Sequence, residues 1–383
     1  MTALNLRRFT RASALKEIRA NHLRQLLTPY EEFFTNRGAP LPPPESSNGL
    51  DYEGLARVFM TPDSDTPQGL AEALYFIHEM STPHGMDDLL YESERRGILL
   101  TGDPDPTPAD VAVQVWLQNP DLLQRKHAEQ HLKRPRSFEY YRTAVFPVPA
   151  FETPTRSSLR KLEQALDAWF VTKRRGDGSR VFVFPKPDAV WFLVRHGLPF
   201  ERKPVIQDGE SSSVFFREEA HDVLAYDPVL GELKMNARSK GEKQLYRKQF
   251  GRHLFGDDEF FPGTAKYTLE PLRRDGAQSL VCTDVDGMDW VVLKHIEFFR
   301  GGPHKEVKVM KATNVFAALE ARQGRFPERL PINRASLHVK FSDSKTPRTI
   351  TIRPPHVTQY TRDDDSVIVE RWFRKRGFII EGA

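Results

Sequence analysis

The sequence has little cysteine and no long apolar run, and both absences narrow the class of protein. Cys282 is the only cysteine among 383 residues, so no internal disulfide can form, which is typical of a reducing compartment. It lies in an apolar stretch, where we expect a buried and inert thiol. No apolar run approaches the ~20 residues of a membrane-spanning helix, and residues 1–11 lack the apolar stretch of a secretory signal. We therefore expect a cytoplasmic protein without a membrane partner.

Common cofactor and metal motifs are also missing. The chain has no G-x-x-x-x-G-K-[ST] phosphate loop, no G-x-G-x-x-G fingerprint and no zinc-knuckle spacing. His127 and His131 are four residues apart on an expected helix, but a metal would need two more ligands, and Ala128 excludes the H-E-x-x-H pattern. A solvated or partly packed pair is the simpler interpretation. No cofactor and no metal ligand are predicted from these motifs.

Charge is distributed unevenly along the chain. Residues 1–150 carry a net charge of −4, residues 151–300 of +1 and residues 301–383 of +7, giving +4 in total. A polyanion would therefore contact the C-terminal part of the chain. The acidic N-terminal part favours a protein partner instead.

Periodicity predicts an α+β protein, with an all-helical N-terminal domain followed by a mixed, mainly antiparallel α+β region. Residues 1–145 contain short helical patterns, the first over 13–34, and the run Thr107-Pro108-Ala109-Asp110 is typical of a helix start. Residues 134–157 are rich in Pro, Arg and Ser, which indicates a boundary. Residues 155–300 are expected to form an α+β domain with mainly antiparallel strands, two of them over 267–272 and 279–283. Residues 301–383 are expected to form a small basic ββα-type domain.

The best-specified stretch, residues 222–255, is expected to form a β-hairpin that runs into a basic helix. Asp227-Pro228 and Gly231 are turn residues, and the apolar pattern places Leu224 opposite Met235 and Tyr226 opposite Leu233. The buried stripe of the helix is Tyr246, Phe250 and Leu254. Its cationic residues are Lys240, Lys243, Arg247, Lys248 and Arg252.

A second basic element is expected near the C-terminus. Leu337 and Ile350 belong to alternating runs that predict a half-buried hairpin with Lys340 and Arg353 on its outer face. We expect this hairpin and the basic helix to contact nucleic-acid phosphates, with binding that weakens as salt rises. Charge reversal of Lys243 and Arg247 is expected to weaken binding with little change in stability.

An apolar strand that ends in Arg195-His196-Gly197 resembles the opening signature of the histidine phosphatase (phosphoglycerate mutase-like) superfamily. The resemblance covers about seven residues, and it implies that His196 accepts the phosphoryl group and Arg195 binds phosphate. His295 would be the second histidine. Leu198 and Ile296 replace residues that the family pattern expects, and the family's fold is mainly parallel, whereas the strands here are expected to be antiparallel.

Glu232-Leu233-Lys234 is similar in spacing to the E-x-K element of PD-(D/E)xK nucleases, which hold Mg²⁺ with an upstream aspartate. In the register above, Asp222 lies on the opposite face and about 15 Å further along the strand, so Asp227 is the local partner. The resemblance implies a site formed by Asp227, Glu232 and Lys234. An ordinary turn with an exposed Glu and Lys explains the same residues.

The sequence thus favours a non-catalytic, nucleic-acid-associated accessory or regulatory protein of bacterial type. Two enzyme hypotheses stay open beside it. One is a metal-dependent nuclease, possibly degenerate, with Mg²⁺ as its only cofactor. The other is a phosphohydrolase that uses His196.

Overall fold

Helices occupy the N-terminal third of the chain and strands most of the remainder, which confirms the predicted α+β class with a helical N-terminus. The structure is a computed structural model that describes residues 8–43, 49–63, 65–101, 104–133, 135–207, 209–263, 265–361 and 365–380. The chain forms two compact units, Met1–Gln130 and His131–Ala383. Each unit is described by itself.

The first unit is a helical cluster around one apolar core. Its helices are α1 (Ala12–Leu15), α2 (Ala20–Leu27), α3 (Glu31–Asn36), α4 (Tyr52–Met60), α5 (Gln68–Met80), α6 (Pro83–Arg95), α7 (Pro108–Gln118) and α8 (Pro120–Gln130). The predicted start of α7 is confirmed, because the Thr107 side chain accepts a hydrogen bond from the backbone N–H of Asp110. The single helix expected over 13–34 is wrong. It is broken into α1, α2 and α3, with a 3-10 turn at Thr28–Tyr30, where Pro29 lacks the N–H that a continuous helix needs.

The second unit is built on a ten-stranded sheet in which all neighbouring strands are antiparallel. The spatial order is β2-β3-β6-β7-β1-β12-β11-β10-β8-β9. The strands are β1 (Ser137–Arg142), β2 (Arg180–Pro185), β3 (Val190–Gly197), β6 (Glu219–Asp227), β7 (Glu232–Asn236), β8 (Met288–Gly301), β9 (Glu306–Lys311), β10 (Ile332–Phe341), β11 (Arg348–Arg353) and β12 (Val357–Gln359). The helices are α9 (Arg156–Thr172), α10 (Lys240–Phe255), α11 (Glu270–Arg274), α12 (Val315–Ala321) and α13 (Asp365–Lys375), with 3-10 turns at His131–Lys133 and Gly276–Leu280.

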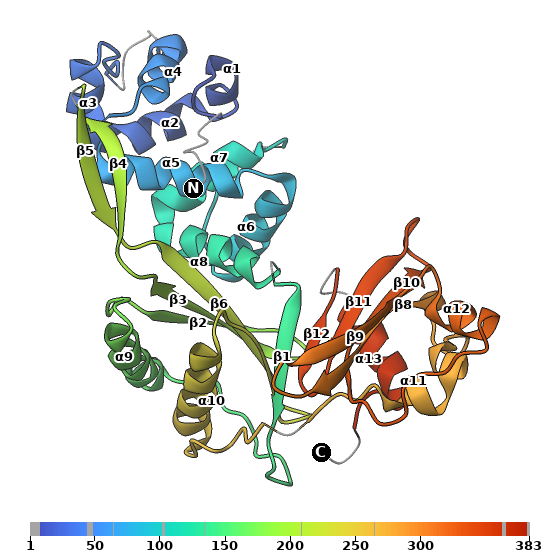
Figure 1. The fold of residues 1–383 in the computed structure, drawn as a ribbon. Helices are drawn as coiled ribbons and strands as arrows, with labels where there is room; N and C mark the ends of the chain where they lie inside the picture. Colours follow the sequence, from blue (N-terminus) through green and yellow to red (C-terminus); the bar gives the residue numbers. More distant parts are fainter. Residues whose placement is uncertain are drawn as a thin grey trace. The chain divides into compact units, whose positions relative to one another are not determined.

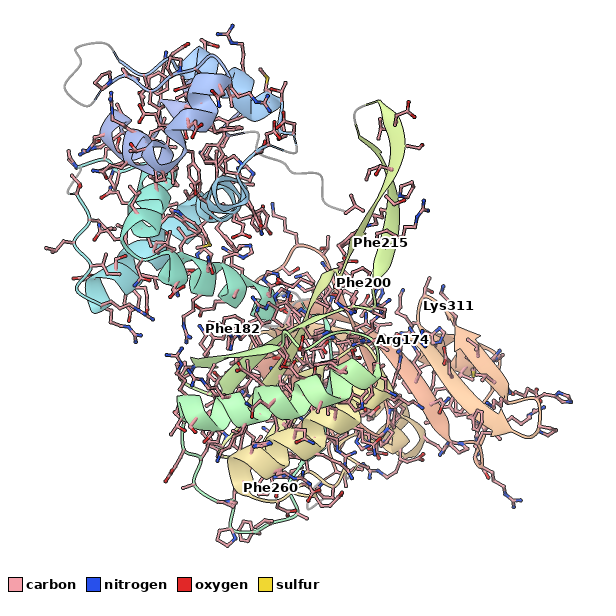
Figure 2. The ribbon with its side chains drawn as sticks, turned by 90° about the vertical axis from the view of Figure 1, so that its left-hand side faces the viewer. Arg174, Phe182, Phe200, Phe215, Phe260 and Lys311 are labelled. Carbon is pink, nitrogen blue, oxygen red and sulfur yellow. The ribbon has the colours of Figure 1, made fainter. Side chains whose placement is uncertain are left out.

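A separate two-stranded hairpin extends from the large sheet. It consists of β4 (Glu201–Gln207) and β5 (Glu210–Phe216), which pair only with each other. Figure 2 shows the labelled Phe200 and Phe215 on this hairpin, and their rings stack with centroids 6.4 Å apart. Both rings are more than half exposed.

The structure divides the chain differently from the predicted domains 1–145, 155–300 and 301–383. The first unit ends at Gln130, and β1 lies inside the stretch 134–157 that was expected to be a boundary. This strand pairs with β7 on one side and β12 on the other. It therefore joins the two predicted C-terminal domains into one sheet, because its backbone hydrogen bonds go to strands from both.

The predicted register of the first hairpin and the presence of the second hairpin are confirmed, whereas two predicted strands are not found. Leu224 pairs with Met235 and Tyr226 with Leu233, and Leu337 pairs with Ile350. The strands expected over 267–272 and 279–283 are wrong, since the chain forms α11 and a 3-10 turn there. Pro at the start of α11 favours the helix over a strand.

The helices lie on opposite faces in the two halves of the sheet. In the half formed by β2, β3, β6 and β7, α9 and α10 run side by side over one face (Figure 1), and Tyr246 and Phe250 are fully buried against Leu224 and Met235. In the other half α13 covers the opposite face. Arg348 of β11 forms an ion pair there with Asp365 of α13.

Among the described residues, no helix is long and apolar enough to span a bilayer.

Candidate nucleic-acid interface

The half of the sheet formed by β8–β11 has one face buried and the other half-exposed. Strand residues alternate between the two faces, and Val291, Leu293, Leu337 and Ile350 point to the buried one. We call the other side of these four strands the open face. Its main polar and aromatic side chains are Trp290, Lys294, His295, Glu297, Phe299, Lys311, Arg334, Ser336, His338, Lys340, Thr349, Thr351 and Arg353.

A row of paired residues crosses the open face and continues over β12 to β1. The partners in this row, in order from the outer strand, are Lys311, His295, Ser336, Thr351, Gln359 and Ser137. Directly opposed residues in antiparallel strands share a face, and five strand spacings of ~4.8 Å make the row about 24 Å long. The row offers hydrogen-bonding groups along its whole length.

Aromatic and cationic side chains flank this row. Trp290 is 42 % exposed, and Phe299 is half-buried on the same face. Lys311, labelled in Figure 2 to the right of α9 and α10, and Arg353 are both exposed. Within the described part of the chain, neither cation forms an ion pair. An exposed sheet with both kinds of side chain can stack bases and contact phosphates.

The other cations of the open face have internal partners. Lys340 donates to Asp289 at 3.0 Å, Arg334 lies 3.4 Å from Glu297, and Lys294 donates to the carbonyl oxygen of Thr313. Burial, together with the charge of Lys294, lowers the pKa of His338. The positive potential of the face therefore rests mainly on Lys311, Arg353 and Lys294.

Most cations predicted on the basic helix α10 are engaged within the protein. Lys248 pairs with Glu259 and Arg252 with Asp258. Lys243 donates to Glu139 of β1 at 2.5 Å. Burial alone would raise the pKa of Glu139, but this hydrogen bond keeps it below its ordinary value. Lys240 is exposed at the start of the helix, and no described residue forms an ion pair with it.

Arg247 has a structural role that the sequence did not reveal. Its guanidinium donates to the carbonyl oxygen of Phe261 at 2.6 and 2.8 Å and lies over the ring of Tyr141. Reversal of charge at Lys243 and Arg247 would break these contacts and leave Glu139 with only the Tyr141 hydroxyl as a hydrogen-bond partner. The expectation that this reversal leaves stability unchanged is therefore not supported by the contacts.

Helix α10 and the open face lie on the same side of the sheet. Glu139 and Tyr141 lie on one face of β1, and both contact α10. The next strand, β12, continues the same face through Val357, which pairs with Glu139. Predicted binding residues from two distant segments, α10 and β10–β11, thus share one side.

The three residues of the nuclease hypothesis do not converge. The Asp227 carboxylate accepts hydrogen bonds from the backbone N–H groups of Val229 and Leu230 and so closes the turn. Glu232 is buried on the opposite side from α10 and accepts from Lys266 at 2.7 Å. Burial raises the pKa of Glu232 despite this partner. Lys234 lies over the rings of Phe138 and Trp191, so its ammonium group forms cation–π contacts.

The two histidines of the phosphatase hypothesis lie far apart. His196 is on β3 and His295 on β8, which are seven positions apart in the sheet order, or about 34 Å at ~4.8 Å per strand. His295 pairs with Glu297 at 2.8 Å, and Arg195 lies 3.6 Å from Glu219 on the sheet face away from His196. No shared phosphate site is formed.

His196 meets Asp222, which the register argument placed on the other face from Glu232, and this placement is found. The Nε2 atom of His196 lies 3.1 Å from Oδ2 of Asp222, and the Tyr246 hydroxyl donates to the same oxygen at 2.6 Å. Burial opposes the charged imidazole, but the hydrogen bond to Asp222 outweighs it and raises the pKa of His196. Nothing in the sequence spacing links these residues, which come from β3, β6 and α10.

No protein-family model matches this chain, and no curated protein matches it significantly in sequence. The function is therefore inferred from the residues and their geometry.

Proposed function

We propose that the protein binds single-stranded nucleic acid on the open face of β8–β11. The observation that carries this proposal is a half-exposed sheet face that combines the exposed Trp290 with Lys311 and Arg353, two exposed cations that form no ion pair with the described residues. Bases stack on exposed aromatic rings in a sequence-tolerant way, and cations neutralise the phosphates. The polar row from Lys311 to Ser137 adds hydrogen-bond donors and acceptors to the same face.

Most cations of α10 are engaged in internal contacts, so the open face, and not α10, is the main proposed binding surface. Lys340 and Arg353 remain proposed contacts, whereas Lys243, Arg247, Lys248 and Arg252 would contribute chiefly by bordering the face. The proposed role remains binding, in an accessory or regulatory capacity. A protein partner for the acidic N-terminal helices and a cytoplasmic location stay predictions.

The experiment is a fluorescence anisotropy titration of the full chain with labelled single-stranded DNA and RNA of about 20 nucleotides, at several salt concentrations. We expect log K to fall linearly with log salt, by about 0.7 per phosphate contacted. The double variant Lys311→Glu/Arg353→Glu should reduce both the affinity and this slope. Trp290→Ala should weaken binding by about 1–3 kcal/mol, since it removes one stacking surface.

The matched control is Arg371→Glu, an exposed arginine on α13, which covers the opposite face of the sheet. It makes the same change of charge as Arg353→Glu and should leave binding nearly unchanged. The proposal fails if neither single strand binds at low salt, or if Arg371→Glu weakens binding as much as the open-face variants. Tighter binding of duplex than of single strands would contradict the stacking role of Trp290.

A further inference from the structure

A buried cluster under α10 has the composition of a metal site. His196 of β3, Asp222 of β6 and Glu242 of α10 each offer one ligand atom, and these atoms lie within 4.8 Å of one another. Their exposed fractions are 3 %, 5 % and 0 %. It is the one group of three or more His, Cys, Asp or Glu with such spacing among the residues that the structure describes.

The His196 ring is oriented as a metal ligand would be. Its Nδ1 atom lies 3.0 Å from the carbonyl oxygen of Gly197. A carbonyl oxygen only accepts, so Nδ1 carries a hydrogen, and Nε2 is the nitrogen directed at the carboxylates. The ring also stacks on Phe170 at a centroid distance of 4.5 Å. Metal-binding histidines commonly have their second nitrogen held by a carbonyl or carboxylate in this way.

Both carboxylates are held by further hydrogen bonds. Tyr246 donates to Asp222. Glu242 accepts from Arg175 and from the backbone N–H of Ser239, with which it forms the capping box of α10. Such supporting donors orient carboxylate ligands and keep them ionised. A pocket of about 320 Å³ adjoins the cluster and is also lined by His221, Asn236 and Arg238.

We propose that His196, Asp222 and Glu242 bind a transition-metal ion such as Zn²⁺ or Mn²⁺. One nitrogen and two oxygen ligands suit these ions, whereas Mg²⁺ and Ca²⁺ prefer oxygen alone. Metal–ligand distances of about 2.0–2.2 Å in tetrahedral geometry place neighbouring ligands about 3.3–3.6 Å apart, so shifts of roughly 1 Å would close the site. The remaining coordination positions would face the pocket, where water or a phosphate oxygen can bind.

The competing explanation is a purely structural ion network. In it, His196 shares a proton with Asp222, and Arg175 neutralises Glu242, so that no ion is needed. The two explanations differ in whether an added ion binds at this place, which isothermal titration calorimetry measures directly.

The test titrates ZnCl₂ or MnCl₂ into the full chain after dialysis against EDTA and then against buffer. We expect one ion per chain in the wild type. His196→Gln should weaken binding by about tenfold or more, and Tyr246→Phe, which removes one donor from Asp222, by about 10–100-fold. The control is His295→Gln, which changes a half-buried histidine on β8 that has its own carboxylate partner, and it should bind like the wild type.

Circular dichroism and the melting temperature show whether each variant is folded. If His196→Gln does not fold, Tyr246→Phe alone decides. The proposal is overturned if the wild type binds no ion, or if the folded variants keep the wild-type stoichiometry and affinity. This result is independent of nucleic-acid binding on the open face.

Discussion

Lys266 connects the two halves of the sheet, and its replacement by methionine should destabilise the second unit strongly. Its ammonium lies 2.7 Å from a carboxylate oxygen of Glu232 on β7 and 3.1 Å from one of Glu370 on α13. It also lies 3.7 Å from the ring centroid of Tyr140 on β1. Both carboxylates and the ammonium are largely buried. Lys266→Met would leave the buried Glu232 without a cation and Glu370 with only Arg374 at 3.9 Å, a change that typically costs about 3–5 kcal/mol.

The loss of stability in Lys266→Met should depend on pH in a direction that follows from the pKa of Glu232. Burial raises the pKa of Glu232 above its ordinary value even with Lys266 present, and removal of the cation should raise it further. A carboxyl group with a raised folded-state pKa favours folding while it is protonated, and this contribution is lost as the pH rises through that pKa. The difference between Lys266→Met and the wild type should therefore be largest near neutral pH and smaller toward about pH 5.

Cys282 provides a probe of this unit, since it is the only cysteine and is buried. Its reaction with a thiol reagent, measured against urea concentration, reports unfolding of the second unit. The matched control is Lys248→Met, which breaks an exposed pair with Glu259 and should cost at most about 1 kcal/mol. A loss for Lys266→Met no larger than for this control, or one that is equal at both pH values, would refute the reasoning.

Two smaller effects follow from the contacts. Ser239→Ala removes the side chain that accepts from the N–H of Glu242 at the start of α10, so unfolding in urea should show a loss of about 1 kcal/mol, within 0.5–2; Ser157→Ala, at an exposed serine within α9, is the control, and equal losses would contradict the role of the cap. Burial raises the pKa of the Cys282 thiol, so the native protein should react with a thiol reagent far more slowly than the urea-unfolded chain; comparable rates would show that the thiol is accessible.

Local patterns predicted the hairpins well because their determinants are neighbours in sequence. The turn Asp227-Pro228 and the alternation of Leu224 and Tyr226 with polar residues leave one register that buries the apolar set. The helix implied by the ββα-type prediction is found as α13, which has basic residues in its last turn and is followed by Gly377 with a φ of +70°.

β1 was missed for a physical reason. Its six residues lie within a stretch rich in Pro and Arg, and a strand that short carries little periodic signal. Its pairing partners, β7 and β12, are about 100 and 220 residues away in the sequence. This stretch was expected to separate the helical domain from residues 155–300, so the strand that joins the two predicted C-terminal domains into one sheet was not foreseen.

The sequence by itself determined the fold class, the register of the first hairpin, the presence of the second hairpin, the excess of positive charge toward the C-terminus and the lack of an internal disulfide. Each depends on composition or on residues close together in the chain. Only the tertiary structure decided which cations remain available to contact a ligand. Glu139, Glu259 and Asp258 neutralise cations of α10, whereas Lys311 and Arg353 stay exposed on the open face. Likewise, His196 and Asp222 meet only because β3 and β6 are neighbours in the sheet, since long-range pairing, and not spacing along the chain, brings ionisable groups together.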